Sequence, residues 1–333
     1  MKYSILIFSC LLLFSEMGIA QQDAMFTQYL YNAVLINPAY AGSRKHMSIG
    51  LLHRSQWLGF GEGAPSTQAF TLHTPMRNKK IGLGFSLYND RIGVANEFGL
   101  QASYAYRFPI GKGDFAIGLQ GGLTNWRAKL NELDQQDPGD PAFTGVDVPS
   151  FLLPNFGVGV YYSTSSFYVG ASIPRLLEND LRREGATNGT NTFANQARHY
   201  YLMGGMAIKF SSEIVFRPSI LIKNVGLFDG FGSSDQKVAA PTEFDIGTAF
   251  LFNELVWAGI SLRSAFAGNN SNSSYDSVDL WTQVALKNGL RVGMAYDISM
   301  GGTRKLSAGS VEVMLGYEFY YEKKNIVHTR YFF

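Results

Sequence analysis

Apolar and polar residues alternate along much of the chain. In residues 98–108 every second side chain is apolar or aromatic, and the side chains between them are small or polar, apart from a few exceptions. The same alternation occurs in residues 81–88, 115–120 and 311–319. A period of two places successive side chains on opposite faces of a β-strand. These segments therefore predict strands with one apolar face and one small or polar face.

About 14 such strands are expected, joined by two kinds of connection. Tight turns, such as residues 77–80, alternate with longer polar loops, such as residues 59–66 and 90–96. All tight turns then lie at one end of the strands, which is typical of transmembrane barrels and not of Greek-key sandwiches. The sequence predicts an all-β transmembrane antiparallel up-and-down β-barrel, with short periplasmic turns and longer extracellular loops. The expected strands are 47–58, 67–76, 81–89, 97–108, 115–129, 155–163, 166–175, 197–210, 214–225, 242–251, 255–266, 276–286, 289–299 and 309–321.

The first 20 residues have the order of a secretory signal peptide. Lys2 precedes an apolar run over residues 5–14, and the segment ends in the small residues around Ala20. Cys10, the only cysteine of the chain, lies inside this run, so the exported protein is expected to have no disulfide. An even number of strands places both chain ends in the periplasm. The expected regions are a signal peptide (1–20), an N-terminal periplasmic segment (21–46), an outer-membrane barrel (47–321) and a C-terminal periplasmic tail (322–333).

The composition supports a membrane barrel and excludes other classes. Only 16% of the residues are charged, against roughly 25% in ordinary soluble domains, while there are 36 glycines and 14% aromatic residues. The formal net charge of +2 includes no basic block, so nucleic acid is not an expected partner. After residue 20 no apolar run approaches 18 residues, which argues against a helical membrane protein.

Candidate chemistry is sparse in this sequence. Five histidines are too scattered for a metal site, and His53 and His73 are interpreted as lumen residues bonded to neighbours. The acidic loop 131–147 does not match the spacing of a calcium loop, and whether it binds calcium stays open. No nucleophile elbow, zinc helix or phosphate loop is present. We therefore expect no enzyme, no catalytic residue, no cofactor and no metal.

An irregular apolar segment precedes the first expected strand. Residues 28–35 could form two turns of helix, which Asn37-Pro38 would end because the residue before proline avoids the helical region. This segment is expected on the periplasmic side, at or inside the barrel mouth. Its residues either shape the turn into the first strand or bind a partner. The candidate partner-binding residues are Tyr31, Asn37, Pro38, Tyr40 and Gly42.

The same segment carries a resemblance to a known family. The stretches FTQYLYNAVLINPAYAGS (26–43) and HRSQWLGFGEGAPSTQAFTLHTP (53–75) resemble the N-terminal signature of the PorP/SprF membrane proteins, associated with the type IX secretion system of Bacteroidetes. Further similar stretches, among them HYYLMGGMAIKF (199–210) and LRVGMAYDIS (290–299), follow in the right order over nearly the whole exported chain. FRP at residues 216–218 stands where the family usually has LKP, a mild departure.

The resemblance implies an outer-membrane β-barrel component of the type IX secretion system. Such a protein assists export or surface attachment of specific large adhesin-type cargo and, in gliding members, motility. The implied partners are the periplasmic and lipoprotein components of the secretion machinery, the sorting domain at the cargo C-terminus, and outer-membrane lipid. No catalytic residues come with the family. Two alternatives stay open: a passive channel or transporter of apolar small molecules, and a lipid hydrolase that uses a serine and a histidine on the outer wall.

Overall fold

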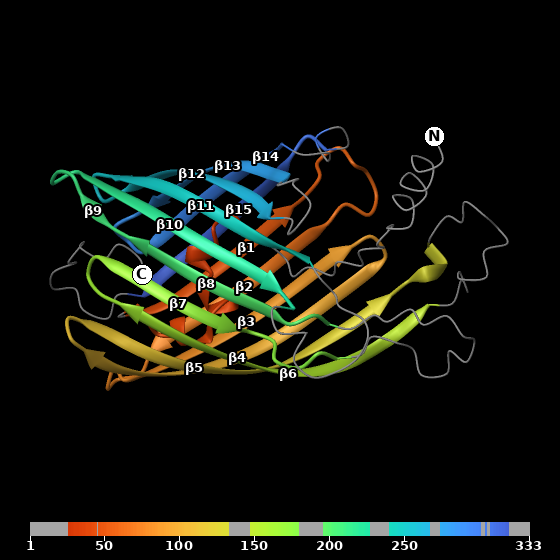
Figure 1. The fold of residues 1–333 in the computed structure, drawn as a ribbon, viewed down its shortest axis with the longest axis horizontal. Helices are drawn as coiled ribbons and strands as arrows, with labels where there is room; N and C mark the ends of the chain where they lie inside the picture. Colours follow the sequence, from red (N-terminus) through yellow and green to blue (C-terminus); the bar gives the residue numbers. More distant parts are fainter. Residues whose placement is uncertain are drawn as a thin grey trace, which may run out of the picture.

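The computed structural model describes residues 26–44, 46–132, 147–179, 196–226, 240–266, 274–300, 304 and 307–319. The expected signal peptide, the C-terminal tail and most of the acidic loop lie outside these residues. Nearly all of the described chain is strand, and the first described residues lie among the strands (Figure 1). No described helix is long and apolar enough to cross a membrane.

Each strand pairs antiparallel with its neighbours in chain order. β15 pairs with β1, which closes the sheet into a barrel. The strands are β1 (Met47–Ser55), β2 (Ser66–Pro75), β3 (Ile81–Ile92), β4 (Ala95–Ile110), β5 (Gly113–Ala128), β6 (Val148–Ser163), β7 (Phe167–Ile173), β8 (His199–Met206), β9 (Ile208–Lys209), β10 (Ile214–Val225), β11 (Ala240–Phe252), β12 (Val256–Phe266), β13 (Ser274–Ala285), β14 (Leu290–Ser299) and β15 (Ser310–Phe319).

β8 and β9 occupy one position in the wall, so the barrel has the 14 positions that the sequence predicts. Both pair with β10, and the break between them lies opposite Arg217 and Pro218. Proline has no N–H to give to a neighbouring strand, so it is tolerated where the pairing is already interrupted. The sequence predicted one continuous strand over residues 197–210, whereas the structure interrupts it opposite Pro218, which cannot donate a hydrogen bond to a paired strand there.

The connection between β3 and β4 differs from its prediction. Residues 90–96 were expected to form a loop, yet both strands continue through this region and Ile92 pairs with Ala95. Only Gly93 and Val94 remain as the turn, and Gly93 adopts a positive φ of 57°. Turns of two residues require such a backbone conformation, which glycine adopts without strain. The polar side chains of residues 89–91 that suggested a loop belong instead to a strand end. The prediction that all tight turns lie at one end is therefore wrong for this connection, which is a tight turn at the end of the long loops.

Charge and apolar surface are distributed opposite to their usual places in a soluble protein. Large apolar side chains face outward, with Leu119 56% exposed and Phe156 58% exposed. Charged side chains such as those of Asp279 and Glu312 face inward and are fully buried. An apolar outer wall around a polar interior is the arrangement of a barrel bathed in lipid. The predicted fold is thereby confirmed.

Candidate functional site in the barrel lumen

Residues 26–44 lie inside the barrel and are called the lumen segment below. They form three short 3-10 helices, η1 (Tyr29–Tyr31), η2 (Ala33–Leu35) and η3 (Pro38–Tyr40), in place of the expected two turns of helix. Asn37 caps the N-terminus of η3, and its side-chain oxygen accepts a hydrogen bond from the N–H of Ala39 at 2.9 Å. Proline at the first position of this helix has the required φ and lacks only an N–H that would be unpaired there. The segment is seen as the red coil enclosed by the strands (Figure 1).

The lumen segment runs along the length of the barrel. Thr27 lies beside Glu312 and Asp297, near the strand ends that lead to the long loops. Arg44 lies beside Ser48 and Glu318, at the opposite end, where the tight turns are. The chain therefore passes through the lumen once before β1 turns back to form the wall.

A row of small residues receives the middle of the lumen segment. Residues of β3 to β7 are direct cross-strand neighbours in this row, which consists of Gly82, Ala105, Gly118, Gly159 and Ser172. A Cβ atom added to Gly118 would lie 2.1 Å from the backbone nitrogen of Ala39, far inside van der Waals contact. At Gly82 and Gly159 an added Cβ would likewise overlap residues of the segment. The small-residue row thus lets backbone pack on backbone, as glycine does wherever two chains approach closely.

Hydrogen bonds fix this middle part to the wall. The hydroxyl of Ser172 donates to the carbonyl oxygen of Ile36 at 2.8 Å, and the amide of Asn37 donates to the carbonyl oxygen of Val160 at 3.0 Å. Arg107 donates to the carbonyl oxygens of Gly42 and Ala41 at 2.7 and 3.1 Å. These bonds satisfy polar groups that water cannot reach in the filled lumen.

A buried carboxylate holds the start of the lumen segment. Glu312 accepts hydrogen bonds from the backbone N–H groups of Thr27 and Gln28 at 2.9 and 2.8 Å. The Thr27 hydroxyl donates to Asp297 at 2.8 Å and accepts from Arg54 at 2.9 Å. Arg54 also forms ion pairs with both acidic side chains. Arg54, the Thr27 hydroxyl and the two backbone N–H groups thus supply donors to both buried carboxylates, as burial of ionised side chains requires.

A second charged group holds the end of the segment. Arg44 forms an ion pair with Glu318 and donates to the hydroxyl of Ser48 at 3.1 Å. Arg291 approaches the same carboxylate at 3.2 Å. Arg44 also donates to the hydroxyl of Tyr40 at 3.3 Å. Because a guanidinium is not deprotonated in proteins, the segment is bound at both ends by ionic groups of the wall.

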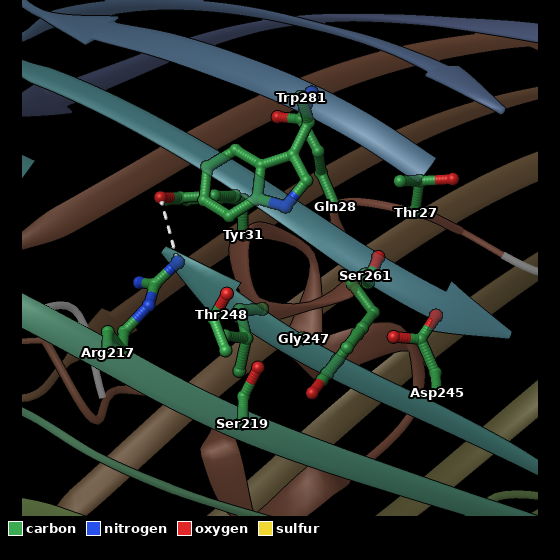
Figure 2. Close-up of a pocket in the computed structure, with 12 residues that line it drawn as sticks. Thr27, Gln28, Tyr31, Arg217, Ser219, Asp245, Gly247, Thr248, Ser261 and Trp281 are labelled. Carbon is green, nitrogen blue, oxygen red and sulfur yellow. Dashed lines mark hydrogen bonds between the residues drawn. The ribbon is translucent and has the colours of Figure 1, made fainter. Parts of the chain in front are cut away.

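Tyr31 packs against a cation held by tryptophans. The guanidinium of Arg217 lies 4.2 Å from the ring centre of Trp257 and 5.6 Å from that of Tyr31, whose hydroxyl accepts a hydrogen bond from it at 3.3 Å. Figure 2 shows this bond, with Trp281 next to the Tyr31 ring. A cavity of about 20 Å³, large enough for a single water molecule, lies beside them. The lumen segment therefore leaves little free volume on this side.

The five candidate partner-binding residues all lie in the lumen segment and are all buried. Asn37 is 0%, Tyr40 1% and Tyr31 5% exposed, and Pro38 and Gly42 are also buried. Their contacts in the structure are with the barrel wall. A role in binding a partner stays a prediction, and it requires these side chains to become accessible.

The sequence did not identify the wall residues that hold the segment. The glycines of the small-residue row and the acids Glu312 and Glu318 all occupy small or polar positions of alternating strands. Alternation assigns such positions to the lumen, but only the register shows that the glycines align. The number of glycines at inward-facing positions could have indicated a filled lumen. Glycines there make room for a chain packed against the wall, and a lumen filled with water does not require such room.

The two histidines of the first strands face opposite sides of the wall. His73 is 3% exposed, faces the lumen and accepts a hydrogen bond from the N–H of Gly42 at 3.3 Å, as expected of a lumen histidine. His53 pairs in register with Gln68, and its exposed side chain faces outward. The prediction of a lumen position is therefore wrong for His53, whose strand places odd-numbered residues such as Leu51 on the outside. Among the described residues no group of three metal-ligating side chains could hold a metal ion.

The closed, apolar-faced wall and the segment packed inside it define the chain as an outer-membrane β-barrel with a filled lumen. The chain belongs to the family of type IX secretion system membrane proteins PorP/SprF, whose model matches residues 18–317. The resemblance seen in the sequence is thereby confirmed. No curated protein sequence matches the chain.

Solved structures share the fold at low sequence identity. The toluene transporter TodX of P. putida is 12% identical, with a TM-score of 0.50 over 87% of this chain and 95% of TodX. A deletion mutant of TodX, described as a monoaromatic hydrocarbon channel, is 14% identical, with a TM-score of 0.52 over 86% of this chain and 94% of the mutant. At such identities the similarity establishes the barrel fold alone.

Proposed function

We propose that this barrel assists export or surface attachment of specific large adhesin-type cargo in type IX secretion, and gliding motility where the cell glides. It does so by binding the sorting domain of the cargo, the periplasmic and lipoprotein components of the machinery, or both. The observation that carries this proposal is the filled lumen of a type IX secretion family member. A lumen occupied along its length by residues 26–44 is suited to a docking component, and the cargo itself passes elsewhere.

The orientation of the barrel belongs to the same proposal. We place the tight turns in the periplasm, where the machinery is found, and the long loops outside, as in other barrels. β1 begins and β15 ends at the tight-turn end, so residues 47 and 319 are periplasmic in this arrangement. A cysteine placed at residue 112, in the turn between β4 and β5, should react with a membrane-impermeant maleimide only after the outer membrane is opened. Reaction in intact cells would reverse the orientation.

The function is tested by comparing the surface and medium proteomes of cells with and without this chain. We expect a small set of large adhesins to disappear from both fractions and to accumulate in the periplasm, while other exported proteins are unchanged. Unchanged export of every adhesin in the deletion strain would exclude the proposal.

A disulfide across the lumen tests whether the segment moves during docking. A Cβ added to Gly84 would lie 3.1 Å from the Cβ of Ala41 and 2.9 Å from Cγ2 of Val34, so a small shift of the segment, with rotation of Val34, brings the two Cβ atoms to the separation of about 3.5–4.5 Å in disulfides. The exported chain has no other cysteine, so Ala41→Cys with Gly84→Cys can form one defined bond. If Tyr31, Asn37 and Tyr40 contact the partner, the oxidised variant should stop cargo export and reduction should restore it. The two single cysteine variants are the controls, and normal export by the oxidised variant would make the segment a fixed plug.

The alternative is a passive channel or a transporter of apolar small molecules. The shared fold with TodX, described as a hydrocarbon channel, brings this alternative to mind but does not favour it at this identity. A passive channel requires the lumen segment to leave its place on the small-residue row. Conductance of the purified barrel in lipid bilayers distinguishes the two roles, since the docking component should be closed.

A further inference from the structure

A row of hydrogen-bonded polar side chains lies on the outer surface of the barrel and extends from β1 to β4, near the long-loop end of these strands. The hydroxyl of Ser55 lies 3.0 Å from Nε2 of His53, and the amide nitrogen of Gln68 lies 3.3 Å from Nδ1 of the same ring. Asn89 donates to Gln68 and Asn96 donates to Asn89, each at 2.9 Å. A serine, a histidine and an amide in this order form the arrangement that activates a serine hydroxyl. We propose that Ser55, His53 and Gln68 form a hydrolase site for carboxylic esters of membrane phospholipids.

The side-chain amide of Gln68 can either donate a hydrogen bond to Nδ1 of His53 or accept one from it, depending on how the amide is turned. As the bonds stand, Gln68 donates to Nδ1, so His53 carries its proton on Nε2 and donates it to Ser55. A half-turn of the amides of Gln68, Asn89 and Asn96 reverses each of these bonds, because oxygen and nitrogen exchange places, at the loss of the bond that Asn96 donates to the carbonyl oxygen of Asp90 at 3.4 Å. The Gln68 oxygen then accepts from Nδ1–H. Nε2 is left to accept the proton of the Ser55 hydroxyl, which is the active state.

The side chains around Ser55 follow the order of a phospholipid's parts, from the charged head group to the apolar acyl chain. Closest to the loops, Ser55, Ser66 and Arg91 are neighbours across β1, β2 and β3. One step further from the loops is the row of His53, Gln68 and Asn89, and beyond it are Leu51, Phe70 and Leu87. A groove of about 430 Å³ adjoins these two inner rows, with Phe98, Val313 and Leu315 also in its lining. An acyl chain in the groove places its ester bond beside Ser55 and its phosphate on the side of Arg91.

The reaction is acyl transfer to serine followed by hydrolysis. Ser55 Oγ attacks the ester carbonyl carbon while its proton passes to His53 Nε2. The bond from that carbon to the glycerol oxygen breaks, and the lysophospholipid leaves with the proton from His53. Water then attacks the acyl-serine, gives a proton to His53, and the fatty acid leaves as Ser55 regains that proton. Ser66, directly across the ladder from Ser55, supplies a hydroxyl donor for the carbonyl oxygen that becomes negative.

This activity is independent of the secretion role, which depends on the lumen and not on the outer wall. The expectation that the chain is not an enzyme rested on the absence of known catalytic motifs and of a serine partner for a histidine, and His53 with Ser55 supplies such a pair on the outer face. The exported full-length chain in detergent micelles should label with a fluorophosphonate probe. It should also release a fluorescent fatty acid from a phospholipid that carries it in ester linkage.

Ser55→Ala should abolish labelling and reduce fatty acid release by roughly 10²-fold or more. Gln68→Leu should slow release by about tenfold, because His53 loses the group that orients it. Ser264→Ala is the matched control, since Ser264 lies between the buried residues Arg263 and Ala265 and so faces outward, on β12, four strands away from β1. Every variant should keep the heat-dependent gel mobility of a folded barrel. Cargo export by cells with Ser55→Ala should be normal, which separates this site from the secretion role.

Absence of both labelling and release from the folded wild-type chain would overturn the proposal. So would release that persists in Ser55→Ala, because the activity would then belong to another group. In either case the row of polar side chains serves only to join the strands β1 to β4 at the membrane surface.

Discussion

Gly118→Leu should open the barrel to ions. The position of its Cβ is already occupied by the backbone of Pro38 and Ala39, which cannot rotate aside as a side chain can. The leucine therefore displaces the middle of the lumen segment from the small-residue row. A 14-position barrel without its filling is intermediate between small barrels filled by side chains and 16–18-stranded porins with an aqueous channel. In planar bilayers we expect the wild type to be closed and the variant to conduct in discrete steps.

Gly121→Leu is the matched control for this experiment. Gly121 lies on the same strand, and an added Cβ there meets no atom within 4 Å. This variant should stay closed and should unfold at the same denaturant concentration as the wild type. A closed Gly118→Leu barrel would mean that the wall moves outward to keep the segment in place.

Glu312→Ala should strongly destabilise the barrel. It removes the acceptor of two backbone N–H groups of the lumen segment and leaves Arg54 with one carboxylate partner fewer in a site that is 2% exposed. Breaking a buried ion pair by removal of one partner costs about 3–5 kcal/mol. The free energy of unfolding, measured by urea titration in lipid vesicles, should fall by this amount. Protease should also cut the segment near Thr27 faster than in the wild type.

Glu132→Ala provides the comparison for a glutamate in an exposed ion pair. Glu132 and Lys129 approach to 2.6 Å, but their side chains are 46% and 53% exposed. Exposed pairs contribute about 0–1 kcal/mol, so this change should leave the unfolding midpoint nearly unaltered. If the two variants lost equal stability, the carboxylate of Glu312 would not be holding the segment.

The sequence was sufficient to predict the wall of the barrel. Alternation in residues such as 98–108 fixes which side chains face outward, and the alternation of turns and loops fixes an up-and-down order. Errors occurred at strand ends. Polar residues at 90–96 belong to strands that extend past the apolar band. The strand predicted over residues 197–210 is interrupted opposite Pro218, which lies on the neighbouring strand and so leaves no signal within residues 197–210.

The contents of the lumen could not be predicted to the same degree. The sequence placed the segment on the periplasmic side, at or inside the barrel mouth, because an even number of strands begins and ends on that side. This prediction is incomplete, since the segment runs the length of the barrel and Thr27 lies near the long-loop end. The row from Gly82 to Ser172 depends on the alignment of five strands, and no short stretch of sequence contains it. His53 was misassigned because two histidines on adjacent strands were assumed to face the same side. A shift of one residue in the pattern reverses that face.

The position of the lumen segment also constrains how the molecule can be assembled. The seam between β1 and β15 joins the first strand to the last, so the cylinder stays unsealed until synthesis and insertion have delivered its final strand. Residues 26–44 precede all of these strands, so they can already lie within the curve of the growing sheet when the seam forms. The sheet can thus curl around the segment as the strands are added. Once the barrel is sealed, the segment can leave only lengthwise, through one of the two rims.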